Sequence, residues 1–425
     1  MRRRRVRAGA LAGVAGLVAV ASLGVSEPAV ALAPDGCQQA PSPGVPIPPL
    51  APRDPLIGRL GLDQAWALST GKGVTVAVVD TGVDPASPKL AGAVQNGQTY
   101  RVVNTPAVFT HAANGRVDCD GHGTEVAGII AGRTTAGDDR VSGIAPAATI
   151  YPVAIQGDIA QAPSALIAAA IRDAADHADV LNLSFAQTTN SPEIAAAVKY
   201  AVSKGRVVVA AAANEAAGAA AGTAATSYPA AYPGVLAVAS VTADGSAATN
   251  TARGKWISLA APGEDLTTVT RGGKGYVTVS GTSFATAIVS GAAALLRAAG
   301  RMSAAEIRTR LQQSAVPPGD GSHDDAIGYG IVDPYAALTT TVRSRSASAP
   351  ESAGAVPVQR VRHKAARSSS ATVLGVTASL MAFAVLVGLA TISVRSGRRR
   401  GWHAGPKPRT AVDERIPEPH PAELG

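Results

Sequence analysis

The sequence predicts an α/β fold in which a central parallel sheet is covered by helices on both faces. Runs of β-branched and small apolar residues, each short enough to be a strand, alternate with longer helical stretches. A strand that is buried on both faces has a nearly continuous run of apolar residues, and the expected strands have this pattern. The expected strands are residues 74–80, 149–155, 180–185 and 207–213.

Two of the expected helices carry clear end signals. One has Ser191 as its N-cap and Pro192 in its first turn, and Gly205 follows just past its end. In a later helix, Ser303 and Glu306 have the spacing of a capping box. We find no internal repeat, and the region that contains these strands and helices reads as a single α/β core.

Three polar residues stand where this fold places functional groups. Asp80 ends a strand, whereas His122 and Ser283 each open a helix, and the carboxyl edge of a parallel sheet is where sites form. A serine hydroxyl needs an imidazole as base and a carboxylate that orients the imidazole. Taken singly, an aspartate, a histidine or a serine at such a position is more often a cap or a structural residue. His177, on an expected helix, stays in that structural class.

Asp80, His122 and Ser283 stand in the segments Val78–Gly82, Gly121–Thr124 and Gly281–Ala285. These three segments resemble the subtilisin family of serine proteases, and more narrowly the mycosins, the membrane-anchored proteases of actinobacterial type VII secretion. The resemblance covers about residues 54–338 and implies the subtilisin-like three-layer fold. The narrower match rests on the cysteine-bearing run 119–124, the N-terminal extension and a C-terminal membrane segment. The motifs are Val-Val-Asp-Thr-Gly at 78–82, Gly-His-Gly-Thr at 121–124 and Gly-Thr-Ser-Phe-Ala at 281–285.

The resemblance implies a serine endopeptidase whose catalytic residues are Asp80, His122 and Ser283. It makes Asn214 the oxyanion-hole residue, with the Ser283 backbone N–H as second donor. This chain has Ala186 where the family usually has Gly, and Ala287 where it usually has Pro. Substrate would bind along two segments, whose residues are Leu183, Ser184, Phe185, Ala211, Ala212 and Ala213.

The N-terminus has the layout of a signal peptide. A basic start precedes an apolar stretch at 10–25 and the small residues Ala31-Leu32-Ala33, so we expect residues 1–33 to be removed after Ala33. The alternative is an uncleaved anchor, for which the apolar stretch is short. Residues 34–54 form a Pro-rich extension, which is too short for a folded chaperone domain, and the mycosin resemblance implies an arm round the core.

A second apolar run, residues 372–394, is uncharged and long enough to span a membrane. A buried core helix is the alternative, but we expect the peptidase domain to occupy only 55–340 and a flexible Ser/Ala-rich stalk 341–371. The arginines that begin the tail, 395–425, place it in the cytoplasm. The expected product is a single-pass protein of the cell membrane with its peptidase domain outside.

Charge and cysteine content limit the partners. The net charge of +8 gathers in the leader and beside the membrane segment, which favours anionic lipid and argues against nucleic acid. No cofactor is expected, and no acidic cluster indicates a metal site. The only cysteines, Cys37 and Cys119, are expected to pair because the chain is exported.

Two functions remain open. One is an endopeptidase that acts on proteins or peptides and trims a few proteins exported by a type VII system. The other is a structural component of that secretion complex, for which proteolysis is dispensable. A general extracytoplasmic protease is a further alternative, although an anchor and a stalk favour a local set of substrates.

Overall fold

The computed structural model describes residues 37, 44–46, 53–104, 108–134, 140–214, 226–300, 302–319 and 321–341. The chain divides into two units, 1–345 and 346–425, and all the described residues belong to the first. The expected signal peptide, transmembrane helix and tail lie outside the described residues, as does the stalk beyond Thr341.

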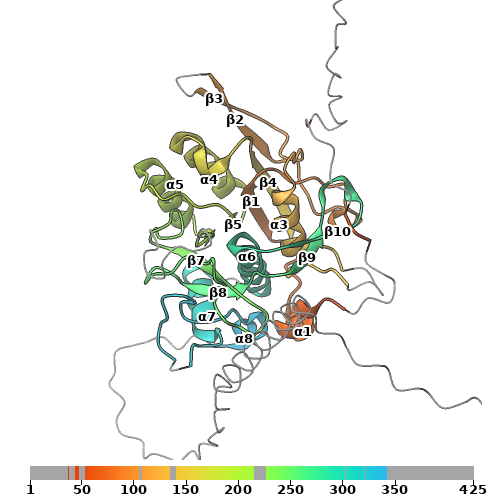
Figure 1. Ribbon diagram of the computed structural model, residues 1–425, viewed down its shortest axis with the longest axis vertical. Coiled ribbons are helices and arrows are strands. Elements are labelled where there is room, and N and C mark those ends of the chain that lie inside the picture. The colour runs from red at the N-terminus through yellow and green to blue at the C-terminus, as the bar shows by residue number, and fades with distance from the viewer. Residues whose placement is uncertain are drawn as a thin grey trace, which may run out of the picture. The chain divides into compact units, whose positions relative to one another are not determined.

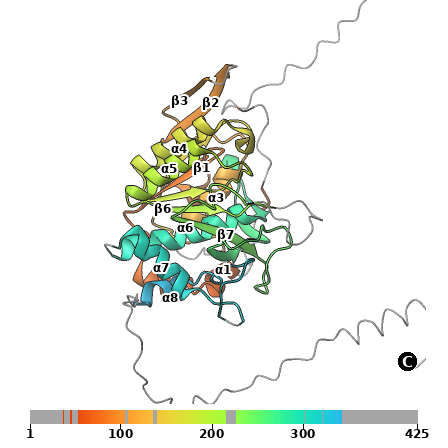
Figure 2. The same ribbon diagram turned by 90° about the vertical axis from the view of Figure 1, so that its left-hand side faces the viewer.

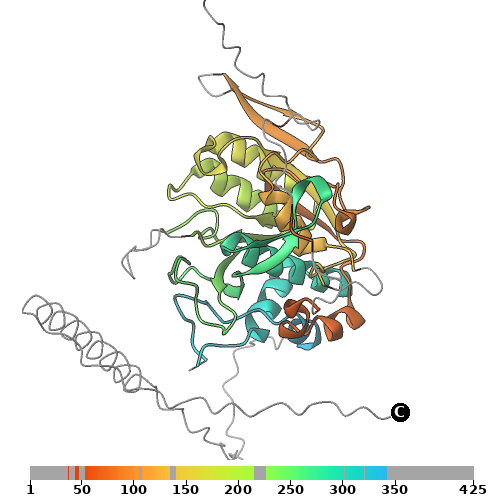
Figure 3. The same ribbon diagram turned by 45° about the vertical axis from the view of Figure 1, so that its right-hand side comes forward.

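The described residues contain one eight-stranded sheet and one two-stranded sheet. The strand order of the large sheet is β3-β2-β4-β1-β5-β6-β7-β8, and all neighbours are parallel except β2 and β3, which form a protruding antiparallel hairpin (Figure 3). In the small sheet β9 pairs with β10. The strands are β1 Thr75–Asp80, β2 Gln98–Asn104, β3 Val108–Ala112, β4 Thr149–Ile155, β5 Val180–Leu183, β6 Val207–Ala211, β7 Val235–Val241, β8 Leu259–Pro262, β9 Leu266–Val269 and β10 Tyr276–Val279.

Helices cover both faces of the large sheet, as Figures 1 and 2 show. Helices α4 and α5 cover one face, and α3 and α6 cover the other; the remaining helices pack near one end of α6. The helices are α1 Pro55–Arg59, α2 Leu62–Leu68, α3 His122–Ala131, α4 Ser164–His177, α5 Pro192–Ser203, α6 Thr282–Ala299, α7 Ala304–Ser314 and α8 Pro334–Thr339, with 3₁₀ turns at Pro88–Leu90, Ile159–Gln161 and Arg271–Gly273.

Alternate residues of each central strand enter different cores. Val76 and Val78 of β1 pack in the core that contains α3 and α6, whereas Ala77 and Val79 pack in the core under α4 and α5. This period of two explains why the strands carry few polar residues: both faces are buried. The three-layer α/β fold expected from the sequence is therefore present.

The expected strands and caps agree closely with the structure. Residues 149–155 form β4 as expected, but the strand expected at 180–185 ends at 183 and the one at 207–213 ends at 211. Ala213 ends the latter because its φ of +85° is incompatible with a strand. The Ser191 side chain accepts from Ile194 N, and the capping box of α7 is complete.

Helix α6 is the one helix of the described part that is long and apolar enough to cross a membrane. It is largely buried and runs through the main core of the first unit. Its apolar composition therefore reflects its place between β-strands and neighbouring helices. It is distinct from the expected membrane segment, 372–394, which lies outside the described residues.

Candidate active site

The carboxyl edge of the sheet brings together the polar residues expected to act in catalysis. Asp80 is the last residue of β1, Asn214 follows β6, and His122 and Ser283 lie at the starts of α3 and α6. Asp80 contacts His122, while Asn214 and Ser283 line the same cavity. The two pairs lie close together, because the His122 ring packs against Phe284, the residue after Ser283.

A buried carboxylate holds the imidazole. His122 Nδ1 lies 2.7 Å from Asp80 Oδ1, and Asp80 is only 1% exposed. Because a carboxylate can only accept, Nδ1 donates the proton and the lone pair of the neutral ring remains on Nε2. The backbone N–H of Thr81 also donates to Oδ1, whereas Oδ2 has no hydrogen-bond partner within the described part of the chain. The imidazole is further packed against Phe284.

The electrostatic surroundings of His122 favour its charged form. Burial alone would lower the pKa of the imidazole, but the charge and hydrogen bond of Asp80, with smaller contributions from Glu125 and Asp120, outweigh it and raise the pKa to about 9. Burial likewise raises the pKa of Glu125 to about 7, against the opposing charge of His122. The imidazole thus lies among carboxylates that all raise its proton affinity.

A second buried carboxylate, Asp118, holds the loop that carries His122. It accepts hydrogen bonds from the backbone N–H groups of Gly121 and Thr124 and from the hydroxyls of Thr81 and Thr124. Burial raises the pKa of Asp118, although these hydrogen bonds act in the opposite direction. Asp118 therefore ties the start of α3 to the residue that follows Asp80.

Glycine is required beside His122. A Cβ atom at Gly123 would lie 2.1 Å from the carbonyl oxygen of Gly82 and 3.1 Å from Cβ of Asp80. No side chain fits there, so the flanking glycine of the motif lets α3 approach the end of β1 closely enough for the Asp80–His122 hydrogen bond.

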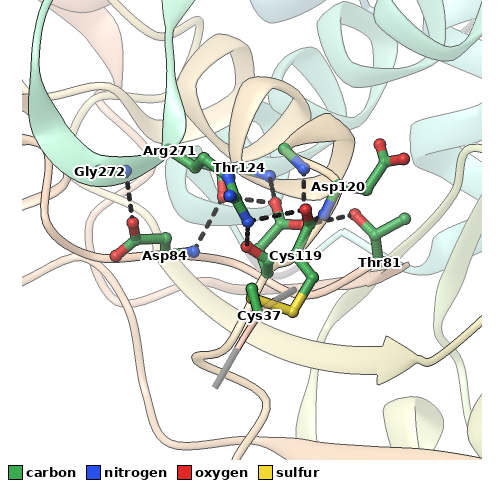
Figure 4. The surroundings of a disulfide bond; sticks show 10 residues. Cys37, Thr81, Asp84, Cys119, Asp120, Thr124, Arg271 and Gly272 are labelled. Atoms are coloured by element: carbon green, nitrogen blue, oxygen red, sulfur yellow. Dashed lines mark hydrogen bonds between the residues drawn. A yellow bond between two sulfur atoms is a disulfide. The ribbon is translucent and has the colours of Figure 1, made fainter. Parts of the chain in front are cut away.

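The N-terminal extension is fastened beside this loop. Cys37 and Cys119 form the expected disulfide, and Figure 4 shows it next to the guanidinium group of Arg271. Arg271 donates to the carbonyl oxygens of Asp118 and Cys119. Further along the extension, Val45 exchanges two backbone hydrogen bonds with Tyr276 of β10. In the part of the extension that the structure describes, Cys37, Val45 and Arg53 each contact the rest of the chain.

Ser283 lies in the first turn of α6 and is 8% exposed. Its hydroxyl donates to the carbonyl oxygen of Ser184 at 3.1 Å, and no hydrogen bond joins it to His122 in the described part. Rotation about the Cα–Cβ bond of Ser283 would turn the hydroxyl away from the Ser184 carbonyl. Gly281, two residues earlier, has φ +143° and lies against the Asn214 amide, so a side chain there would be strained.

The Asn214 amide has a fixed orientation. Its Oδ1 accepts from both the backbone N–H and the hydroxyl of Thr282, at 2.9 and 3.0 Å. This assignment makes Nδ2 the donor that the amide can offer in the cavity that Ser283 also lines. Sequence reasoning did not find Thr282, although it stands next to Ser283 in the motif.

A cavity of about 400 Å³ opens beside Ser283. Of the residues expected to bind substrate, Ser184, Phe185, Ala211 and Ala213 line it. Leu183 and Ala212 do not, because their side chains are fully buried in the two neighbouring cores. The remaining lining residues are Ala186, Gln187, Thr188, Asn214, Ser227, Ala252, Thr282 and Ser283.

Several of these residues carried no signal in the sequence. Ser227 and Ala252 reach the cavity from loops far from the motifs, and nothing in their local sequence marks them. Asp118 was also missed, yet its signal existed: an Asp three residues before a glycine and a helix start is a common capping pattern. His177, expected to be structural, stacks on Tyr151, and its Nδ1 atom lies 3.2 Å from Oδ1 of Asp173.

The sequence profile of the subtilase family matches residues 71–330, which include Asp80, His122, Asn214 and Ser283. The chain belongs to the subtilase family. This subtilase is 33% identical to Mycosin-3 of Mycobacterium tuberculosis in an alignment of 418 positions that covers 84% of the chain and 85% of that protein. It is 36% identical to thermitase of Thermoactinomyces vulgaris, covering 59% of the chain and 84% of thermitase.

Solved structures give the same assignment. MycP1 from Mycobacterium smegmatis superposes on this subtilase with a TM-score of 0.60 at 30% identity, covering 75% of the chain and 94% of MycP1. A chain of an intact ESX-5 inner membrane complex superposes with a TM-score of 0.61 at 30% identity, covering 84% and 94%. The subtilisin-like fold is thus confirmed, and this subtilase is a serine endopeptidase of the mycosin type.

Proposed function

We propose that Ser283 is the nucleophile of this endopeptidase, His122 its general base and Asp80 the carboxylate that orients the base. The observation that supports this most directly is the 2.7 Å hydrogen bond between Asp80 and His122 at the sheet edge where α6 begins. It fixes the imidazole tautomer in which Nε2 can accept a proton. Asn214 Nδ2 and the Ser283 backbone N–H would form the oxyanion hole.

Each residue then has one task during acyl transfer. The Ser283 hydroxyl turns from the Ser184 carbonyl, loses its proton to His122 Nε2 and attacks the scissile carbonyl. Asp80 stabilises the imidazolium that results, and the two N–H donors stabilise the oxyanion. His122 returns the proton to the leaving amine. The Ser184–Phe185 and Ala211–Ala213 segments would bind the substrate in the 400 Å³ cavity.

We further propose the domain layout and location expected from the sequence. The chain would be exported by residues 1–33, carry the extension 34–54 and the peptidase domain 55–340 outside, and be anchored by 372–394 through the stalk 341–371, with 395–425 in the cytoplasm. The relatives support membrane association, since one similar chain belongs to the inner membrane complex named ESX-5. Substrates would be a few proteins exported by a type VII system.

A second role, as a structural component of such a complex, is favoured by the same similarity. Similar chains occur in the periplasmic assembly of the ESX-5 inner membrane complex as well as in the intact complex. Components of a type VII secretion complex would then be partners. The two roles are compatible, because a protease held in a complex acts on what passes through it.

A fluorophosphonate probe tests the catalytic proposal, since it modifies only an activated serine. The full chain, purified in mild detergent, should be labelled, and Ser283→Ala and His122→Ala should each abolish labelling while the thermal midpoint stays near the wild-type value. Labelling that persists in Ser283→Ala would refute the assignment of the nucleophile. A well-folded wild type that takes no label would refute the catalytic proposal.

The two roles separate in the host cell. Ser283→Ala, expressed at the native level in place of the wild type, keeps the fold and removes the nucleophile, whereas deletion of the whole chain removes both roles. If secretion continues in Ser283→Ala cells but substrates stay unprocessed, the structural role is separate from proteolysis. If secretion stops in both strains, proteolysis itself is required.

A further inference from the structure

A buried chain of polar side chains links strand β5 to the start of α6. It runs from Ser290 through Asn182 and Ser184 to Ser283, and all four residues are buried. Asn182 is 0% exposed in a strand that is otherwise apolar. A buried amide costs free energy unless every polar atom is paired, so its position needs an explanation.

Every hydrogen bond in this chain has one direction. The Ser290 hydroxyl donates to Asn182 Oδ1 at 2.9 Å, and Asn182 Nδ2 donates to Ser184 Oγ at 2.7 Å. Because the Ser184 oxygen accepts this bond, its hydroxyl acts as a donor on the other side, and it donates to the Ser283 carbonyl oxygen at 3.1 Å. The opposite flip of the amide would make Ser290 the acceptor and would draw the Ser184 hydroxyl to the amide oxygen, which leaves the Ser283 carbonyl without its Ser184 donor.

The chain holds α6 to β5 at two levels. Ser290 lies seven residues after Ser283, nearly two helical turns, so both residues lie on the same face of α6. That face meets Asn182 of β5 and Ser184, which directly follows the last residue of the strand. Leu181 and Leu183, between and beside them, enter the opposite core. Asn182 therefore contacts α6 below the nucleophile and, through Ser184, at the nucleophile itself.

We infer that Asn182 is a positioning residue that, together with Ser290 and Ser184, sets the place of the Ser283 hydroxyl relative to the imidazole. The inference deepens the proposed function and depends on Ser283 being the nucleophile. An error of about 1 Å in the place of a nucleophile can cost about 100-fold in rate. A directional chain of buried hydrogen bonds has fewer alternative arrangements than apolar packing and so defines one position for the helix start.

Ser290→Ala tests the inference because Ser290 is remote from the cavity and touches no substrate. The change leaves Asn182 Oδ1 unpaired, so the amide can reorient and release Ser184. We expect the rate of fluorophosphonate labelling of the full chain to fall about 10-fold, with kcat for a peptide substrate falling by the same factor and KM nearly unchanged. Ser290→Thr, which keeps the hydroxyl, should restore most of the rate.

Ser69→Ala is the matched control. Ser69 is also buried, and its hydroxyl donates to the Leu295 carbonyl at 2.7 Å, near the other end of α6. The two variants should lose similar thermal stability, but Ser69→Ala should label at the wild-type rate. If Ser290→Ala labels as fast as Ser69→Ala, the network is structural only and the inference is wrong.

Two further arms keep the outcomes distinct. If Ser290→Ala does not fold, Ser290→Cys, which keeps the volume with a weaker donor, replaces it, and wild-type labelling of that variant would equally overturn the inference. The wild type and Ser283→Ala are labelled in the same series. Absence of Ser283-dependent labelling in the wild type would refute the proposed nucleophile and the inference with it, whereas a normal wild type beside a normal Ser290→Ala refutes the inference alone.

Discussion

The Nδ1 atom of His122 lies 2.7 Å from Oδ1 of Asp80, and this contact sets both the tautomer and the proton affinity of the ring. A base must be neutral to act, but the surroundings of His122 raise its pKa to about 9. The same contact that orients the proposed base therefore favours its protonated form at neutral pH, and the acid limb of the activity profile should lie at unusually high pH.

We expect kcat/KM for a peptide substrate to rise from pH 7 to about pH 9, as His122 loses its proton. The free energy of unfolding should change in the opposite direction. Because the pKa of His122 is raised from 6.5 to about 9 in the folded state, protonated His122 stabilises the fold fully below pH 6.5, and this contribution is lost as the pH rises through 9. In Glu125→Gln the activity limb should move to lower pH, because one carboxylate that raises the imidazole pKa is gone.

Steady-state kinetics and thermal midpoints at half-unit pH steps check both parts. Asp325→Asn is the control, since that exposed carboxylate is not among the charges acting on His122 and should leave the profile unchanged. An activity limb at the ordinary histidine value of 6.5 in the wild type, or an unmoved limb in Glu125→Gln, would contradict the electrostatic account.

Ala213 adopts φ +85°, a conformation that costs an L-residue free energy and that glycine adopts readily. Ala213→Gly should therefore raise the free energy of unfolding by about 0.5–1 kcal/mol, once the greater freedom of glycine in the unfolded chain is subtracted. Ala212→Gly, next to it in the ordinary region, should lower it by about 1 kcal/mol. Urea unfolding of both variants measures the difference, and destabilisation by both would contradict the strain.

The disulfide joins residues 82 positions apart, so its removal frees a long loop in the unfolded chain. Cys37→Ser with Cys119→Ser should lower the free energy of unfolding by up to about 4 kcal/mol in the chain-entropy model. The Asp118 hydrogen bonds do not depend on the disulfide, so the folded variant should keep its fluorophosphonate reactivity. Loss of labelling at a temperature where circular dichroism reports a native fold would show that the disulfide also shapes the site.

Asn214 lines the cavity with Nδ2 as its available donor. Asn214→Ala should lower kcat about 100- to 1,000-fold with little change in KM, a magnitude that comes from subtilisin itself and is borrowed here. Thr282→Val should have a smaller effect, because it removes one of the two hydrogen bonds that orient the amide. Equal activity of Asn214→Ala and wild type would exclude Asn214 from the oxyanion hole.

The four adjacent strands β4, β1, β5 and β6, half of the large sheet, could be predicted because burial on both faces forces a distinct apolar pattern on each of them. Strand β4 agrees to the residue, since Thr149–Ile155 is bounded by turns. The N-caps of α5 and α7 could also be predicted, because capping depends on residues that are close in sequence. The ends of strands were harder to predict. Strand β6 stops at Ala211 because the backbone of Ala213 has a positive φ, and an alanine gives no sequence signal for that conformation.

The site could be predicted only where one local motif carries it. Asp80, His122 and Ser283 each stand in a glycine-marked segment, so their place at the carboxyl edge of the sheet could be inferred. The network of Asn182 and Ser290 could not, because it joins residues 108 positions apart that look like ordinary strand and helix residues. The cavity lining by Ser227 and Ala252 likewise depends on how distant loops pack.

The pairing of Val45 with Tyr276 has a consequence for solubility. This isolated β-bridge places Val45 against the edge of β10, so a residue that precedes the peptidase domain covers the backbone N–H and C=O of Tyr276, which would otherwise be open to another molecule. A chain shortened past Pro46 would expose that edge, with the half-buried Tyr276 on it, and would be prone to self-association through strand pairing.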